Sequence, residues 1–362
     1  MSKLLSVQIL RALAALAIAM HHAQYDAAGL AQRLGLGFRA IEAPWSAGVD
    51  VFFVISGFIM VHASRGLFGE PGASRVFLAR RVARIAPLYW AATSLYLAVA
   101  LAAPALLNSE GLSPGLVLAS YVFLPWARPD GAVQPAYSLG WTLNYEMFFY
   151  ALFALALTRP WRQGVPALIA MLLALVAFGR LLGSAAPWRF WTDPIILEFA
   201  FGMALGVARL KGARLGPIVR AVLAGGGLVL FALDLARPEG ALASLRVLAY
   251  GVPATMLVAA AALAPDEGRA SSLARFGAWL GDASYALYLV HPFVIRGARE
   301  IVWDSDLAGV IGPWGFVVAS LGATILAALL VHRWFERPTT DRVRRWLEPA
   351  MPRGTGEPAR TR

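Results

Sequence analysis

Apolar stretches long enough to cross a bilayer alternate with short polar stretches along almost the whole chain. A helix rises about 1.5 Å per residue, so roughly 20 apolar residues cross the hydrocarbon core. Ten stretches of this kind predict membrane-spanning helices at 4–22, 47–63, 85–106, 143–158, 165–183, 194–208, 219–234, 247–264, 284–302 and 313–332. The pattern therefore predicts an all-α bundle of about ten transmembrane helices.

A shorter apolar stretch at 115–125 decides the predicted topology. If it crosses the membrane, the basic segments at 159–162 and 209–220 fall outside, and if it does not, every strongly basic segment falls inside. The positive-inside rule favours the second arrangement, with both termini in the cytoplasm. Residues 107–142 then form a long external loop, open to a partly re-entrant course, that can cover a site.

The composition agrees with a polytopic membrane protein, because 59% of the residues are hydrophobic and only 15% are charged. We expect one integral-membrane domain at 1–340 and a disordered, basic cytoplasmic tail at 341–362, because its last residues, PRGTGEPARTR, have the composition of a disordered segment. The first apolar stretch resembles a signal peptide, but Arg11 interrupts it. We therefore expect an uncleaved first span.

The net charge of +11 is spread over short loops beside apolar helices. This distribution is typical of membrane orientation signals and contacts with membrane lipids, so nucleic acid is not an expected partner. Cysteine is absent, which excludes disulfides, thiolate metal sites and a cysteine acyl-enzyme. No metal site is predicted.

Arg11 and His22 lie on one face of the first predicted span. Their separation of eleven residues equals about three helical turns plus about 20°, or about 16 Å along the axis. A cation inside a membrane helix costs about 2.5 to 3.5 kcal/mol on insertion scales, so Arg11 needs a buried partner or a ligand. His22 reaches the outer face, where a neutral imidazole can accept a proton from an attacking alcohol. The alternative for His22 is an interfacial residue without chemistry.

Two acidic residues are candidates to assist His22. Asp50 opens the second predicted span near the outer level of His22, where a carboxylate can fix the imidazole tautomer. Its alternative role is to cap the helix or pair with its dipole. Glu146 lies about one turn inside the fourth predicted span and needs a partner, for which Arg11 is the obvious candidate.

The segment FLARRVARIAPLYW at 77–90 places a basic cluster between the second and third predicted spans. Arg81 and Arg84 lie one turn apart there and can clamp phosphates, although orientation and anionic-lipid contact explain them as well. Later, Tyr288 and His291 share a helical face with Ser284. We expect these three residues to pack against the site or orient it.

Taken together, these segments resemble the acyltransferase 3 family of bacterial integral-membrane acyltransferases, most closely its exopolysaccharide-modifying (ExoZ-like) branch. Arg11 and His22 fit the family's R-x10-H signature. The other matching motifs, in chain order, are GVDVFFVISGFIM, FLARRVARIAPLYW, WTLNYEMFFY and GDASYALYLVHP. The resemblance covers nearly the whole chain.

The resemblance implies an O-acyltransferase of the bacterial inner membrane. It would move an acyl group, usually acetyl, from cytoplasmic acyl-CoA to a hydroxyl of a glycan or lipid-linked oligosaccharide at the outer face. Acyl-CoA would be a co-substrate, with no cofactor bound permanently. The polysaccharide synthesis machinery would be a further partner.

The residues suggest roles within this reaction. Arg81 and Arg84 would hold the nucleotide phosphates, the pantetheine arm would run along the Arg11 face, and His22 would deprotonate the hydroxyl. A two-step route through an acyl-histidine stays open. Two other classes also stay open: a transporter or flippase of lipid-linked glycan precursors, and a non-catalytic partner of a polysaccharide synthase.

Overall fold

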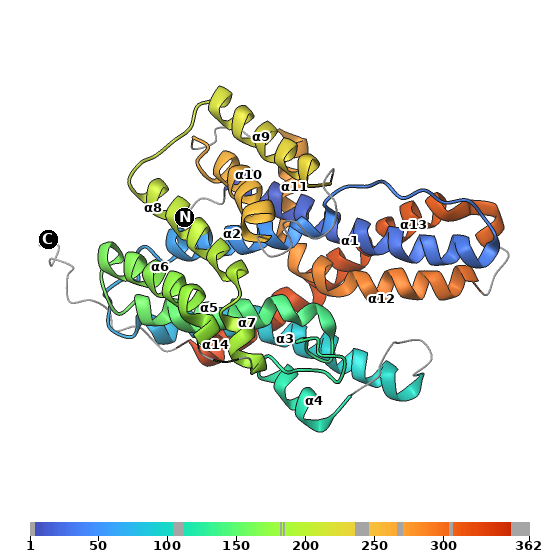
Figure 1. Ribbon diagram of the computed structural model, residues 1–362, viewed down its shortest axis with the longest axis horizontal. Coiled ribbons are helices and arrows are strands. Elements are labelled where there is room, and N and C mark those ends of the chain that lie inside the picture. Colours follow the sequence, from blue (N-terminus) through green and yellow to red (C-terminus); the bar gives the residue numbers. More distant parts are fainter. Residues whose placement is uncertain are drawn as a thin grey trace, which may run out of the picture.

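The fold is helical, as Figure 1 shows. The computed structural model describes residues 4–103, 112–181, 183, 185–235, 246–265, 271–303 and 307–348. Within those ranges the extended structure is limited to one isolated bridge between Ala127 and Val133. The prediction of an all-α fold is therefore confirmed.

Each of the ten predicted spans coincides with a helix. These helices are α1 (Leu5–Leu34), α2 (Gly48–Ala63), α3 (Ala73–Ala102), α5 (Trp141–Ala156), α6 (Trp161–Phe178), α8 (Leu197–Leu210), α9 (Pro217–Leu235), α10 (Val252–Ala262), α12 (Ser284–Trp303) and α13 (Leu307–Val331). Among the described residues, five helical stretches are long and apolar enough to cross a membrane: Leu5–Leu34, Trp45–Ala63, Ala73–Ala102, Trp161–Phe178 and Gly309–Leu347. The number of spans and the cytoplasmic termini stay predictions.

The stretch at 115–125 forms a helix too short to cross the hydrocarbon core by itself. It forms α4 (Pro114–Tyr121), whose eight residues span only about 12 Å. The Ser113 hydroxyl caps this helix by accepting a bond from the Leu116 amide at 3.2 Å. Three other short helices are α7 (Ala186–Trp191), α11 (Ser272–Asp282) and α14 (Arg337–Leu347).

Helix α1 is longer than predicted and continues past residue 22 to Leu34. Its 30 residues span about 45 Å, against about 30 Å of hydrocarbon. The added part packs on the ends of α12 and α13 through a separate apolar cluster: Ala23, Ala27, Leu30, Ile295, Val302, Phe316 and Val317. We call these three helix ends the projecting arm; they extend side by side at the right of Figure 1. The prediction ended α1 too early because residues 23–34 are amphipathic rather than uniformly apolar.

Helix α3 also differs from the prediction, since it begins at Ala73 instead of residue 85. Gly72, with φ of 77°, precedes the helix start, and Pro87 is accommodated within it. The prediction of a basic loop is therefore wrong, because Arg81 and Arg84 lie on α3, two to three turns from its start. Both side chains line a cavity within the bundle, described below.

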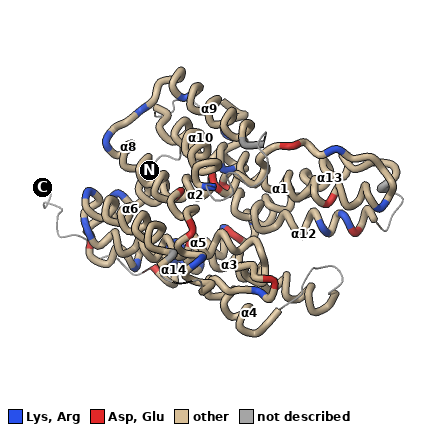
Figure 2. Tube along the Cα trace, in the orientation of Figure 1, with Lys and Arg blue, Asp and Glu red and all other residues tan. Residues whose placement is uncertain are grey.

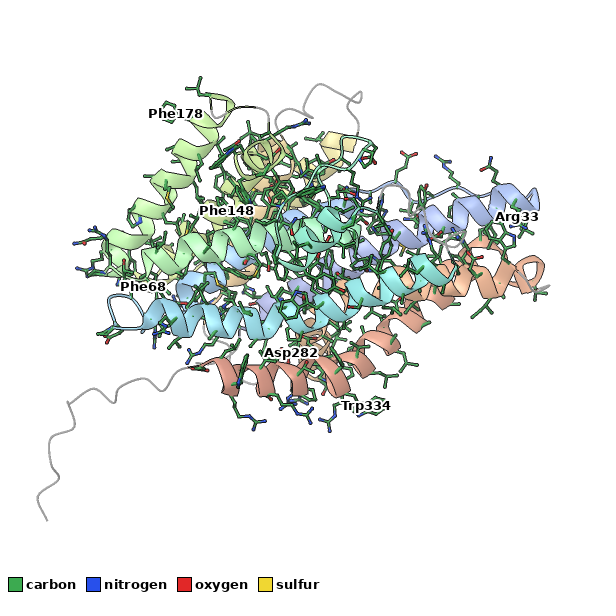
Figure 3. The ribbon with its side chains drawn as sticks, turned by 90° about the horizontal axis from the view of Figure 1, so that it is seen from below. Arg33, Phe68, Phe148, Phe178, Asp282 and Trp334 are labelled. Atoms are coloured by element: carbon green, nitrogen blue, oxygen red, sulfur yellow. The ribbon has the colours of Figure 1, made fainter. Side chains whose placement is uncertain are left out.

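The prediction of a disordered tail is wrong for its beginning, because residues 341–347 are helical. Helix α13 continues through a π-helical turn, η8 (His332–Glu336), into α14. Helix α14 packs on α3, where Arg80 forms an ion pair of 2.5 Å with Glu348. The exposed ring of Trp334 points away from the bundle (Figure 3). The predicted disordered end at 352–362 lies outside the described residues.

Helices α2 and α8 pack closely because glycines face backbone across their interface. A Cβ at Gly57 would lie 2.1 Å from the Phe199 carbonyl oxygen, and one at Gly202 would lie 2.0 Å from the Val54 oxygen. Small residues of this kind let membrane helices approach each other. This contact holds the face of α2 that lines the cavity described below.

We expect Gly57→Ala and Gly202→Ala to destabilise the protein, because the added methyl groups meet rigid backbone. Overpacking typically costs about 1 to 3 kcal/mol. Thermal unfolding of detergent-purified variants, with membrane yield, measures the effect. The control is Gly322→Ala, because no atom lies within 4 Å of the Cβ position there. Equal melting temperatures for all three variants would contradict the packing argument.

Candidate functional site

Charged side chains from three helices line one cavity within the bundle. They are Arg11 from α1, Arg81 and Arg84 from α3, and Glu146 from α5; α2 and α12 complete the wall. The cavity has a volume of about 110 Å³, which suits a narrow chain or a few water molecules. Tyr288 also lines the cavity, so the structure brings together five of the predicted site residues.

Arg11 is surrounded by ionisable groups. Glu146, Glu336 and Asp282 are all close enough to act on its charge, as is Arg84. Glu336 is buried in η8, where the His332 Nδ1 lies 2.8 Å from its carboxylate. Sequence reasoning proposed Glu146 as the partner of Arg11 and missed Glu336, which follows the last apolar stretch.

The cavity lining carries more positive than negative charge. It contains three arginines and one glutamate, Glu146, whose carboxylate accepts a bond of 2.8 Å from the Tyr150 hydroxyl. The Arg81 guanidinium also lies 5.3 Å from the centre of the Phe77 ring, which favours a cation. Guanidiniums facing an apolar cavity favour an anion or a polarised carbonyl oxygen as ligand.

Tyr288 connects the cavity to the histidines. It belongs to the lining, and its hydroxyl lies 3.0 Å from Thr142 Oγ1 and 2.9 Å from the Leu139 carbonyl oxygen. The His291 ring follows at 6.1 Å from the Tyr288 ring, and the His22 ring lies 5.1 Å beyond it, centre to centre. His22 is therefore outside the lining but adjoins it through two rings of α12.

His291 is fully buried and oriented by its own helix. Its Nδ1 lies 3.2 Å from the Leu287 carbonyl oxygen, so a proton on Nδ1 makes that hydrogen bond. Its Nε2 has no hydrogen-bond partner among the described residues. This nitrogen is free to accept a proton from a neighbouring group, and the neighbouring ring is His22.

Asp50 does not contact His22, contrary to the sequence prediction. Its carboxylate forms a 2.8 Å ion pair with Arg246, and Glu198 lies beside it. The ionisable neighbours of His22 are instead His21, His291 and Arg296. The physical reason is the rotation of α2: Val49 and Phe52 face the cavity, which turns Asp50 toward α8 and the segment before α10.

Asp50 and Glu198 form a buried acidic pair, of which the sequence analysis named Asp50 but not Glu198. Both side chains are fully buried, while Arg246 provides the cation. The available signal was that Glu198 lies within a predicted apolar span and Arg246 borders another, where an ionisable residue needs a partner. This trio ties α2 to α8 and α10 behind the cavity wall.

The loop after α4 packs over α12 close to His291. The Tyr137 hydroxyl donates a 2.8 Å bond to the Leu289 carbonyl oxygen, and its ring stacks on Phe293 at 5.2 Å. Arg128 bonds the Pro135 and Ala136 carbonyl oxygens, which fixes the loop shape. Burial raises the pKa of Tyr137 well above its usual range, so it stays a neutral donor.

Comparison with known proteins now identifies the class of this site. A model of the acyltransferase 3 family, which defines an acyltransferase domain, matches residues 4–333. The chain belongs to this family. As a family member it is an acyltransferase, and its apolar helices agree with a membrane location.

Two curated proteins are similar to this acyltransferase over most of their lengths. It is 38% identical over 314 residues to the exopolysaccharide production protein ExoZ of Rhizobium meliloti (strain 1021), covering 83% of this chain and 90% of that protein. It is 27% identical over 384 residues to the acyltransferase MdmB of Streptomyces mycarofaciens, covering 93% and 91%. No solved structure matches.

We expect Arg246→Gln to destabilise this acyltransferase strongly, because it leaves two buried carboxylates without their cation. Breaking a buried ion pair costs about 3 to 5 kcal/mol. Glu198→Gln should have the smallest effect of the single changes, since the Asp50–Arg246 pair survives. The double variant Asp50→Asn with Arg246→Gln should recover part of the yield lost by Arg246→Gln alone.

Thermal unfolding and membrane yield of Arg246→Gln, Glu198→Gln, Asp50→Asn and the double variant measure this coupling. If the double variant is as unstable as the sum of its two single variants, the charges are not coupled.

Proposed function

We propose that this membrane acyltransferase moves an acyl group, acetyl in the simplest case, from cytoplasmic acyl-CoA to a hydroxyl of an exopolysaccharide or another cell-surface glycan. The observation that carries the proposal is that one cavity is lined by Arg11, Arg81, Arg84 and Glu146. Tyr288 also lines this cavity, and its ring lies beside the His291–His22 pair. The name of the relative from Rhizobium meliloti supports exopolysaccharide as the acceptor class.

The arginines suit the donor. Acyl-CoA carries phosphates at one end and a thioester at the other, joined by a narrow pantetheine arm. Arg81 and Arg84 offer planar, bidentate donors to its anionic groups, and both lie on the part of α3 that leads into the cavity. Arg11 faces the same cavity and would hold the arm or polarise the thioester carbonyl. The donor then reaches toward Tyr288 without crossing the membrane as a whole.

His22 suits the role of general base. The acceptor oxygen attacks the thioester carbonyl carbon, its proton passes to His22, the carbon–sulfur bond breaks, and CoA leaves as a thiol after protonation. An ester on the glycan is the second product. His291 would position His22, because its unpartnered Nε2 can accept a hydrogen bond from the His22 ring while Leu287 fixes its other nitrogen. This arrangement replaces the carboxylate partner that the sequence suggested for His22.

We expect His22→Ala to lower acyl transfer by about 10²- to 10⁴-fold without loss of folded protein, the range typical of general-base removal. The glycan O-acetyl content of cells, read by NMR, and transfer from labelled acetyl-CoA in proteoliposomes both report it. His21→Ala is the matched control, since His21 is exposed, adjacent in sequence and in contact with the His22 ring, but is not the proposed base. Full acetylation with His22→Ala would refute the proposal.

We expect Arg81→Gln and Arg84→Gln to raise the KM for acetyl-CoA by about tenfold or more, because each loses charge-assisted bonds to the donor. The rate with an acetyl thioester of a short amino-thiol, which lacks the nucleotide, should stay close to wild type. Arg80→Gln is the control, because Arg80 is absent from the cavity lining and pairs with Glu348. A loss that is equal with both donors would show that the arginines support the fold and do not bind the nucleotide.

A further inference from the structure

Phe52 and Tyr288 face each other at one end of the cavity. Both side chains belong to its lining, and their rings lie 6.4 Å apart, centre to centre, in an edge-to-face arrangement. Thr142 belongs to the same end, because its Oγ1 lies 3.0 Å from the Tyr288 hydroxyl. The His291 ring lies next to the Tyr288 ring, 6.1 Å away. We call the lining formed by Phe52, Thr142 and Tyr288 the histidine end of the cavity.

Arg81 lies toward the opposite end of the cavity. Along α2 the lining extends from Val49 to Met60, which is about 16 Å. In the half of this stretch nearer Met60, Ser56 Oγ lies 3.4 Å from the Tyr150 hydroxyl. The Arg81 guanidinium lies 6.0 Å from the centre of the Tyr150 ring. A donor whose phosphates bind Arg81 therefore points its thioester toward the histidine end.

The packing around the histidine end resists widening. The Tyr288 hydroxyl also lies 2.9 Å from the Leu139 carbonyl oxygen, so its ring is held to the start of α5. Phe52 stands on α2, whose start is pressed against α1, because a Cβ at Gly48 would meet the Ala14 carbonyl oxygen. The glycine contacts with α8 hold the other side of α2. A larger group at this end therefore has to displace closely packed helices, which is unfavourable.

The three residues of the histidine end carry no charge. Helix α12 carries its charged residues in the projecting arm, beyond Tyr288, as Figure 2 shows. Asp50, the acidic residue of α2, is turned away from the cavity and binds Arg246. An uncharged carbon chain suits such a site, so length is the property of the acyl group that this end can select.

The inference rests on the proposed function, which places the acyl group at this end. The acceptor oxygen attacks the thioester carbonyl carbon and its proton passes to His22, so the carbonyl lies at the histidine end. The carbon chain beyond the carbonyl then packs against Phe52 and Tyr288. The whole cavity has about 110 Å³, and the end of the pantetheine arm occupies part of it. Each added methylene therefore meets packed side chains instead of free space.

We propose that Phe52, held opposite Tyr288, limits the length of the acyl group that this enzyme accepts, so that short groups such as acetyl fit and longer ones such as hexanoyl do not. Phe52 is a specificity residue here and takes no part in proton transfer. Its side chain is apolar, so shortening it changes the space at the histidine end without removing a hydrogen bond. Tyr288 lacks this property, because its hydroxyl is bonded.

The test is competition binding of acetyl-CoA and hexanoyl-CoA to purified protein in nanodiscs, with free CoA as the reference probe. We expect wild type to bind hexanoyl-CoA about tenfold more weakly than acetyl-CoA or worse. Phe52→Ala should remove this difference and Phe52→Trp should enlarge it, while free CoA binds all three proteins alike. Phe148→Ala is the matched control, because this partly buried ring, labelled in Figure 3, stacks on Trp191 at 4.9 Å and does not line the cavity. It should keep the wild-type preference.

Two outcomes would overturn the inference. Wild type could bind both acyl-CoA probes equally, or Phe52→Ala could keep the wild-type preference while it still binds free CoA. If Phe52→Ala does not fold, Phe52→Leu decides in the same way, since it removes less volume and should shift the preference in the same direction. A wild type that binds neither free CoA nor acetyl-CoA would instead refute the donor of the proposed function, and the inference would fall with it.

Discussion

The burial of the Arg11 guanidinium within the bundle constrains the rest of the structure. A charge there is tolerated only when other groups offset it, and three carboxylates from separate parts of the chain act on it: Glu146, Asp282 and Glu336. These groups come from α5, the end of α11 and η8. Elements from both halves of the sequence therefore meet around Arg11. The cavity lies beside Arg11, between these helices.

The same constraint explains why part of the site is visible in the sequence. Intramembrane charges are costly and rare, so Arg11 and Glu146 stand out in apolar stretches, and the structure places both at one cavity. The helix rule that put His22 on the Arg11 face depends only on local geometry. His22 does approach the cavity, through His291 and Tyr288. Local periodicity and the cost of charge burial together predicted these positions.

The predictions that were wrong concern features that tertiary packing decides. Asp50 and Val49 are neighbours in sequence, yet Val49 lines the cavity while Asp50 binds Arg246. Helix α2 is apolar and buried on most sides, so its sequence has no polar face to indicate its rotation. Likewise, the ends of α1 and α3 were misplaced because hydropathy marks where apolar composition stops, and both helices continue through amphipathic or basic turns.

The separation of Arg11 from His22 has a chemical consequence. A thioester held among arginines in an open site would be exposed to water, which competes with the glycan hydroxyl as a nucleophile. In this protein the two charged regions are joined by Tyr288 and His291, both buried, and Tyr137 secures the loop over that junction. In the proposed reaction, the length of α1 between the two side chains, about 16 Å, would set the distance over which the acyl group is kept from bulk water before it meets the proposed base, His22.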